Sequence, residues 1–131
     1  MSVGDSATPL GKVRGLGSAG HGGEHWLAER VTSAALLLLG TWLIASLLLL
    51  PSLDQRTLVE WLAAPSGAVP MTLFVVTAFI HGLAGMKVVV DDYVHDEGNH
   101  FAVNTLLLFL AAAGAALSLF ALARIAFGAE A

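Results

Sequence analysis

The sequence predicts an all-α integral membrane protein with three transmembrane helices, and its composition is the first reason. Of its 131 residues, 56% are hydrophobic and only 12% are charged, and the mean hydropathy is +0.78. Average soluble chains are roughly 25% charged, and a soluble domain of this length could not bury so much apolar surface. The second reason is that the apolar residues gather in three long stretches. Contact with lipid in place of water explains both observations.

Each stretch reaches the length of about twenty apolar residues that a membrane helix requires. The first covers residues 31–50 and stops at Pro51. The second covers 69–90, with Pro70 suited to its first turn. The third covers 101–127. No strand-like alternation persists, and backbone polar groups in lipid must be satisfied within their own segment. Helices are therefore expected in all three stretches.

The remaining sequence sets the domain organisation and excludes several chemistries. Residues 1–24 are rich in Gly, Ser and Ala and lack the apolar core of a secretory signal. They are interpreted as a flexible cytoplasmic tail, and 25–128 as a three-helix membrane anchor domain. The absence of cysteine excludes disulfides, thiolate catalysis and protein-held iron–sulfur clusters within this chain. The net charge of −4 comes with no basic block for nucleic acid.

The distribution of basic residues predicts the orientation in the membrane. Four of them lie on the side of the first stretch's N-terminus: Lys12, Arg14, Arg30 and Lys87. Arg56 and Arg124 lie on the opposite side. Because basic residues are enriched in cytoplasmic segments, the N-terminus is expected in the cytoplasm. The C-terminus is expected in the periplasm, with the chain in a bacterial cytoplasmic membrane.

His81 is the most informative single residue, because it lies inside the second apolar stretch. An ionisable side chain in a membrane segment is costly and is a functional-site candidate. Gly85 falls only about 40° from it around a helix and one turn further along, which leaves room for a flat ligand. Haem iron readily takes an imidazole ligand, although the second ligand would have to come from another chain. The alternative is a histidine that bridges two helices, with Gly85 as a packing notch.

The second stretch ends in an acidic residue and a tyrosine, Asp92 and Tyr93. Asp92 falls within about 20° of the His81 face, Tyr93 about 120° away, and His81 lies roughly 18 Å along the axis from Tyr93. The tyrosine hydroxyl could donate to a quinone carbonyl, with Asp92 tuning that bond or relaying protons. The alternative is an interfacial aromatic residue. His95 and His100 are expected to be exposed loop histidines.

The start of the first helix offers a further candidate, Arg30. It is either an anchor that reaches towards the membrane surface or the partner of an anionic group such as a haem propionate. Lys87 is expected to reach the surface in the same way. Trp26 and Trp42 are either interfacial or packing residues, and their spacing does not decide which.

These residues together carry a resemblance to a known family. The pattern of His81, three residues and Gly85, followed by Asp-Asp-Tyr-Val-His at 91–95, resembles the signature of the succinate dehydrogenase hydrophobic membrane anchor, the D-type subunit. Residues 25–33 resemble that family's entry into its first helix. The likeness covers roughly residues 17–128.

The resemblance implies an assembly and a set of residue roles. The family's anchors pair with a C-type cytochrome b anchor subunit, so this chain would be half of a heterodimeric helical bundle. Both dock the flavoprotein and iron–sulfur subunits on the cytoplasmic face. His81 would match an axial ligand of haem b, shared with the partner anchor. Tyr93 and Asp92 would match residues at the ubiquinone site. Arg30 and His25 would match residues near the haem propionates.

The implied function is that of a membrane anchor in succinate dehydrogenase, the succinate:quinone oxidoreductase also called complex II. The chain itself would do no succinate chemistry and would supply part of the quinone site. A fumarate reductase-type anchor is the first alternative. A cofactor-free structural or assembly protein of the membrane is the second. A small transporter is less expected, because three short spans offer few polar residues for a path.

Overall fold

The computed structural model describes residues 22–128 and contains four α-helices there. They are α2 (Gly22–Leu49), α3 (Gln55–Ala63), α4 (Pro65–Tyr93) and α5 (Glu97–Ala126). The helices α2, α4 and α5 are long and apolar enough to cross a membrane, and the described residues contain no strand. The predicted fold class, all-α with three membrane helices, is confirmed.

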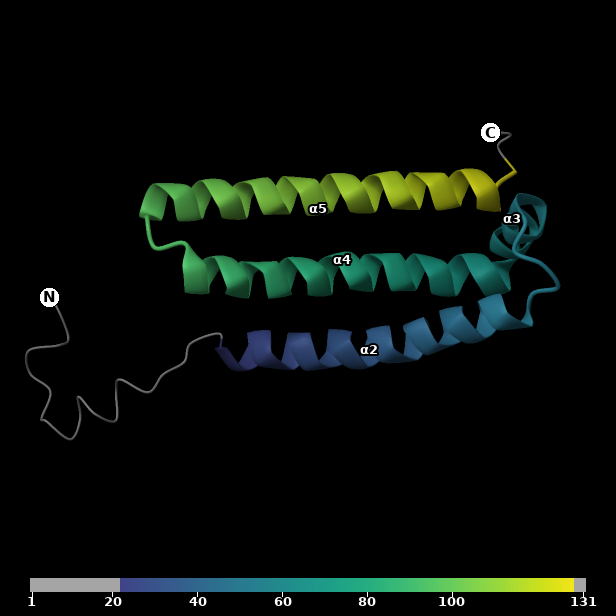
Figure 1. The fold of residues 1–131 in the computed structure, drawn as a ribbon, viewed down its shortest axis with the longest axis horizontal. Helices are drawn as coiled ribbons and strands as arrows, with labels where there is room; N and C mark the ends of the chain where they lie inside the picture. The colour runs from purple at the N-terminus through teal and green to yellow at the C-terminus, as the bar shows by residue number, and fades with distance from the viewer. Residues whose placement is uncertain (1–21, 129–131) are drawn as a thin grey trace, which may run out of the picture.

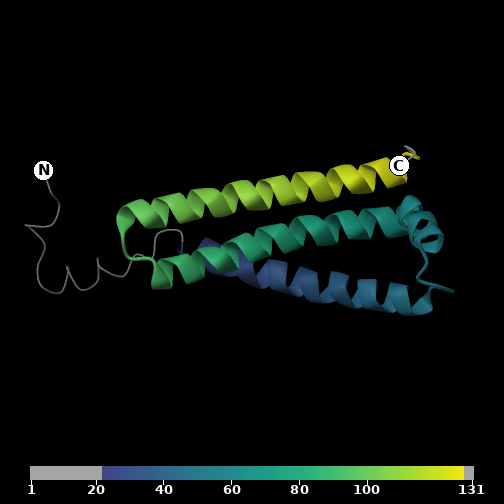
Figure 2. The same cartoon turned by 45° about the horizontal axis from the view of Figure 1, so that its top comes forward.

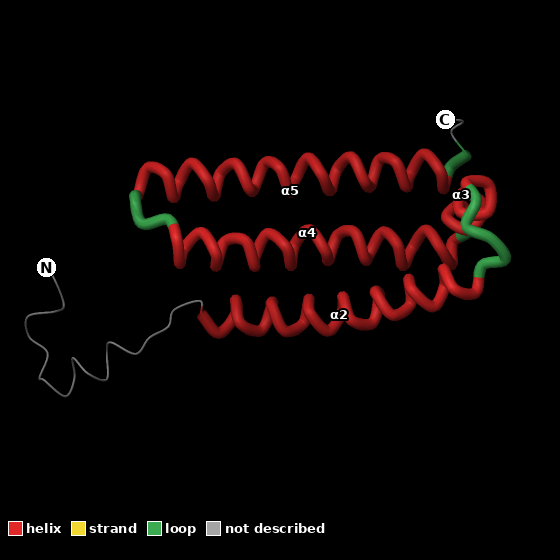
Figure 3. The backbone as a smooth tube through the Cα atoms, in the orientation of Figure 1, coloured by secondary structure: helices red, strands yellow, loops and turns green. Residues whose placement is uncertain are grey.

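The helix α4 is central and packs against α2 on one side and α5 on the other (Figure 1). The start of α2, the end of α4 and the start of α5 lie at the same end of the bundle, and α3 lies at the other end (Figures 1 and 2). We call the first of these ends the rim. Short loops connect the helices (Figure 3). The predicted rim residues therefore gather on one side of the molecule.

The helix ends follow local sequence signals, with one correction. The first long helix ends at Leu49, before Pro51, because the residue that precedes a proline is disfavoured in helical conformation. The helix α4 begins at Pro65, which occupies its first turn. The prediction that Pro70 lies in the first turn is therefore wrong, since Pro70 lies inside the helix. The predicted tail lies outside the described residues, except residues 22–24, which begin α2.

The short helix α3 was not predicted, and it is stabilised at its start by Asp54. The Asp54 carboxylate accepts a hydrogen bond from the Thr57 backbone N–H at 3.0 Å, as an N-cap residue does. The pKa of Asp54 is lowered to about 2, mainly by the hydrogen bond from the Ser52 hydroxyl and to a smaller extent by the hydrogen bonds from Thr57. The ring of Trp61 on α3 stacks on Trp42 of α2, with centroids 5.6 Å apart. Trp42 is thus a packing residue that holds α3 against the bundle.

Very little of the described chain is buried within itself. Val90, at 5% exposure, is its only buried large hydrophobic residue. Exposed leucines lie along all three long helices, exposed valines lie on α2 and α4, and exposed phenylalanines lie on α5. Contiguous exposed apolar surface of this kind marks contact with a membrane or with other proteins. The bundle is therefore an open layer whose faces require lipid or neighbouring helices.

Gly67 is the position where an added side chain would disturb the fold most. It is buried at the start of α4, and a Cβ placed there would overlap the carbonyl oxygen of Trp61. We expect Gly67→Ala to push α3 away from α4 and to cost about 2–3 kcal/mol, the upper part of the range for overpacking. Thermal unfolding of the purified complex, followed by tryptophan fluorescence, measures this. The control is Gly98→Ala, where the nearest atom is at an ordinary 3.5 Å; equal melting temperatures for the two variants would refute the prediction.

Candidate functional site

The His81 side chain lies midway along α4 and faces α2. Its Nδ1 atom is 2.9 Å from the Thr32 hydroxyl oxygen, and both residues are half-buried. The same hydroxyl oxygen lies 2.8 Å from the Ala28 carbonyl and 3.1 Å from the Glu29 carbonyl. Because one turn of α2 presents both carbonyls to this hydroxyl, α2 determines how the imidazole is held.

The second ring nitrogen of His81, Nε2, is not buried within the described residues. Within residues 22–128, Thr32 is the hydrogen-bond partner of the ring, and none meets Nε2. A Cβ added at Gly85, one turn further along, would meet nothing within 4 Å, and the same holds at Gly82. Gly85 therefore does not serve as a packing notch against another described helix. The contrast is Gly114 on α5, where an added Cβ would be 2.7 Å from the Phe79 ring.

This arrangement fits an axial ligand of a haem. The porphyrin supplies four nitrogens, so the protein needs to supply only axial ligands, and histidine is a common one. The described residues hold no cluster of three or more His, Asp or Glu side chains that could bind a metal ion by themselves. A single imidazole with one ring nitrogen tied and the other open therefore suits an axial position. The second axial ligand would have to come from outside the described residues.

The rim holds the predicted pair Asp92 and Tyr93, and both are exposed. Tyr93 is the last residue of α4, and its exposure is 79%. The neighbouring Asp91 points to α5 instead, where its carboxylate lies 2.7 Å from Nε2 of His100. His100 lies in the first turn of α5 and is half-buried. The expectation of an exposed loop histidine is wrong for His100, whereas His95 does lie exposed in the loop.

The other predicted cofactor-supporting residues lie in the first three turns of α2, at the same end as the rim (Figure 1). The Arg30 guanidinium lies over the Trp26 ring, 5.4 Å from its centroid, and both side chains are exposed. The imidazole of His25 lies 3.7 Å from the Glu29 carboxylate. The structure brings neither Arg30 nor His25 into contact with His81. Both side chains are exposed.

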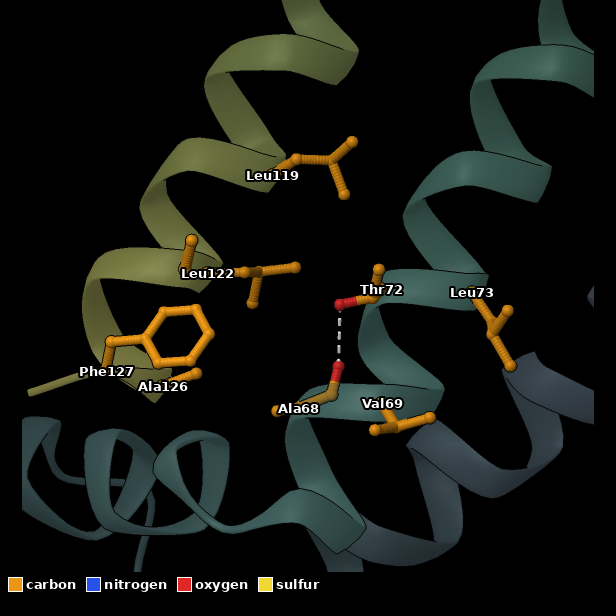
Figure 4. A pocket seen from close by; sticks show the side chains of 9 residues that line it. Ala68, Val69, Thr72, Leu73, Leu119, Leu122, Ala126 and Phe127 are labelled. Atoms are coloured by element: carbon orange, nitrogen blue, oxygen red, sulfur yellow. Dashed lines mark hydrogen bonds between the residues drawn. The ribbon is translucent and has the colours of Figure 1, made fainter.

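A groove of about 380 Å³ lies between the start of α4 and the end of α5 (Figure 4). Its lining is aliphatic or aromatic apart from Thr72, whose hydroxyl donates to the Ala68 carbonyl at 2.8 Å. Thr72 is nine residues from His81, or about 14 Å along the helix. The groove presents an apolar surface with no free polar group, so it does not form part of the candidate site.

Comparison with known proteins places the chain in a family. Residues 4–121 match the family of succinate dehydrogenase/fumarate reductase transmembrane subunits. The chain belongs to this family. It is 34% identical over 107 residues to a succinate dehydrogenase hydrophobic membrane anchor subunit from Rickettsia conorii, covering 81% of this chain and 82% of that protein. It is 31% identical over 122 residues to the subunit of the same name from Paracoccus denitrificans, covering 93% and 94%.

Membership of this family confirms the resemblance found in the sequence. Three helices that could span a membrane and bacterial relatives with membrane-anchor names identify a multi-pass inner-membrane protein. The family also includes fumarate reductase subunits by its description. The relatives compared above carry the succinate dehydrogenase name alone.

Sequence reasoning missed Thr32 as a member of the site. The residue lies two positions after Arg30, in the segment 25–33 that carried part of the resemblance. A hydroxyl residue inside an apolar helix was the available signal, because such a group must find a partner in lipid. Its actual partner, His81, is 49 residues away in the sequence.

Proposed function

We propose that the chain is the membrane anchor subunit of succinate dehydrogenase, and that it helps to bind haem b and to form the ubiquinone reduction site. One observation carries the proposal: His81 is held by α2 through Nδ1, Nε2 is left unburied and without a partner among the described residues, and there is open space at Gly85 one turn further along. Family membership and the names of the relatives support it. A role in helix bridging alone would not require this open space.

In this proposal His81 supplies one axial ligand to haem b, and the C-type cytochrome b anchor subunit supplies the other. When bound, the haem provides a one-electron redox centre inside the membrane. The exposed apolar faces of α2, α4 and α5 are the surfaces that the partner anchor and the lipid would cover. Arg30 and His25 would pair with the propionates at the rim, since guanidinium groups bind carboxylates strongly.

Tyr93 and Asp92 act at the quinone. Reduction of ubiquinone to ubiquinol takes up two electrons and two protons, and the electrons come from succinate oxidised in the flavoprotein subunit, through the iron–sulfur subunit. The Tyr93 hydroxyl donates a hydrogen bond to a quinone carbonyl, which orients the ring and stabilises the charge that develops on its oxygen. Asp92 holds or passes a proton beside that oxygen.

In this proposal the rim lies on the cytoplasmic side, where the soluble subunits would dock. Arg30 at the start of α2 and Lys87 near the end of α4 lie towards this end, and Arg56 and Arg124 lie towards the opposite end (Figure 1). The enrichment of basic residues in cytoplasmic segments supports this orientation. It places the N-terminus in the cytoplasm and the C-terminus in the periplasm.

Co-purification through an affinity tag on this chain tests the proposed function. The expected product contains a flavoprotein subunit, an iron–sulfur subunit and a second membrane anchor, with a b-type haem band in its reduced-minus-oxidised spectrum. It should also reduce a ubiquinone analogue with succinate. A colourless chain that purifies without these subunits would support the cofactor-free structural alternative. Faster fumarate reduction than succinate oxidation, with a low-potential quinol as donor, would favour the fumarate reductase alternative.

A further inference from the structure

We propose that Thr32 is a positioning residue for His81, which fixes the imidazole in the tautomer that leaves Nε2 free to bind iron. The inference rests on the proposed function of His81 as a haem ligand and deepens it. It assigns a role to a residue of α2 in a site whose ligand lies on α4. The contact that carries it is the 2.9 Å approach of the Thr32 hydroxyl to Nδ1.

The protons in this contact can be assigned from the neighbouring carbonyls. A threonine hydroxyl has one proton to donate and an oxygen that can accept. The Ala28 and Glu29 carbonyls, at 2.8 Å and 3.1 Å from the hydroxyl oxygen, can only accept. The hydroxyl proton therefore goes to the α2 backbone, and the oxygen accepts the proton of Nδ1. A neutral imidazole with its proton on Nδ1 carries its lone pair on Nε2.

This tautomer is the one that a metal site at Nε2 requires. A histidine that binds a metal almost always donates its other N–H to a fixed acceptor, which sets the ring orientation and raises the basicity of the ligand. Here the acceptor is the Thr32 hydroxyl, which is held in place by its hydrogen bond to the α2 backbone. The ring that donates to it belongs to α4. Gly85 lies on the same face of α4 one turn further along, and an added Cβ there would meet nothing within 4 Å.

The contact between Thr32 and His81 joins two helices, and it also affects how strongly the imidazole would donate electrons to iron. If Thr32 were only a bridge between helices, any side chain of similar shape would serve. If it accepts the Nδ1 proton, an isosteric apolar side chain leaves that proton without a partner and makes the imidazole a weaker donor. Weaker donation stabilises ferric iron less, so the haem midpoint potential should rise, because hydrogen bonding around a haem tunes its potential.

The test compares Thr32→Val with Thr32→Ser in the intact, purified complex. Thr32→Val keeps the shape and removes the hydroxyl. We expect it to weaken haem retention about 10- to 100-fold, the usual effect of losing such an acceptor. We also expect a raised midpoint potential and a shifted low-spin ferric signal in electron paramagnetic resonance. Thr32→Ser keeps the oxygen and should remain close to the unsubstituted complex in all three measurements.

Thr41→Val is the matched control, because Thr41 lies on the same helix and its hydroxyl is bonded only to the Leu37 carbonyl among the described residues. It should change none of the three measurements. If Thr32→Val fails to assemble, Thr32→Ala provides the same comparison with Thr32→Ser. Unchanged haem properties in the Thr32 variants, with haem lost from His81→Ala, would overturn the positioning role and leave the proposed function standing. Haem retained in His81→Ala would overturn the proposed function itself.

Discussion

Replacement of His81 by alanine is expected to release haem from the assembled complex while succinate oxidation with a soluble electron acceptor continues. In the described part of the chain, His81 is the one histidine near the middle of a helix that could span a membrane, and its Nε2 is neither buried nor partnered. Loss of an outer-shell partner costs about 10- to 100-fold in metal affinity, so loss of the ligand itself should cost on the order of 100-fold or more. Haem per flavin, from the visible spectrum of the purified complex, is the measurement.

A matched control is His100→Ala, which removes another half-buried histidine from the α4–α5 contact. Because His100 pairs with Asp91 at the rim, its loss should leave the haem content and spectrum unchanged. His81→Gly adds a positive test, since it leaves a space that free imidazole can enter. Added imidazole should restore the b-type spectrum in His81→Gly and should have no effect on His100→Ala.

Retention of haem after the removal of His81 would have a different explanation. If His81 only bridges α2 and α4, its removal costs one hydrogen bond, about 1 kcal/mol of folding free energy. The complex would then melt earlier and keep its haem. Unchanged haem in both His81→Ala and His81→Gly would therefore identify His81 as a bridging residue and refute its role as a ligand.

The three membrane helices and the rim were predictable because both depend on local properties. Hydropathy and segment length identify a membrane span without knowledge of its neighbours, and Pro51 marked the end of α2 correctly. The start of α4 was missed because two prolines, Pro65 and Pro70, compete as first-turn signals. The helix α3 was missed because it has only nine residues and lies between two spans. Its stability depends on the Asp54 cap and on the stacking of Trp61.

The site itself was only half predictable, for a different physical reason. His81 and Gly85 share a face of one helix, so their relation follows from helix geometry. The partners of α4 on its neighbours follow from tertiary packing, which no periodicity in the sequence reveals. Thr32 reaches His81 from α2, and His100 reaches Asp91 from α5. These two contacts determine which side chains of α4 remain free for a ligand.

Tyr93→Phe is expected to lower ubiquinone reduction about 10- to 100-fold, with succinate oxidation by a soluble acceptor unchanged. A hydrogen bond to a charged group contributes about 1.5–3 kcal/mol, and this substitution removes only the hydroxyl that would donate it. Two assays on the same purified complex, one with a ubiquinone analogue and one with a soluble dye, measure the two activities. The control is Phe101→Leu, which removes another exposed aromatic ring near the rim.

The geometry of α4 explains why Tyr93, of the three polar residues that end the helix, should contact the quinone. Asp91 is turned to α5 by its contact with His100, and Tyr93 lies about 200° further around the helix. Its phenol therefore points away from α5, and its exposure is 79%. An interfacial anchor would tolerate phenylalanine, because the ring is kept, and both activities would then survive. Equal loss of both would indicate failed assembly. Selective loss of quinone reduction is the result that only a hydrogen bond from the hydroxyl explains.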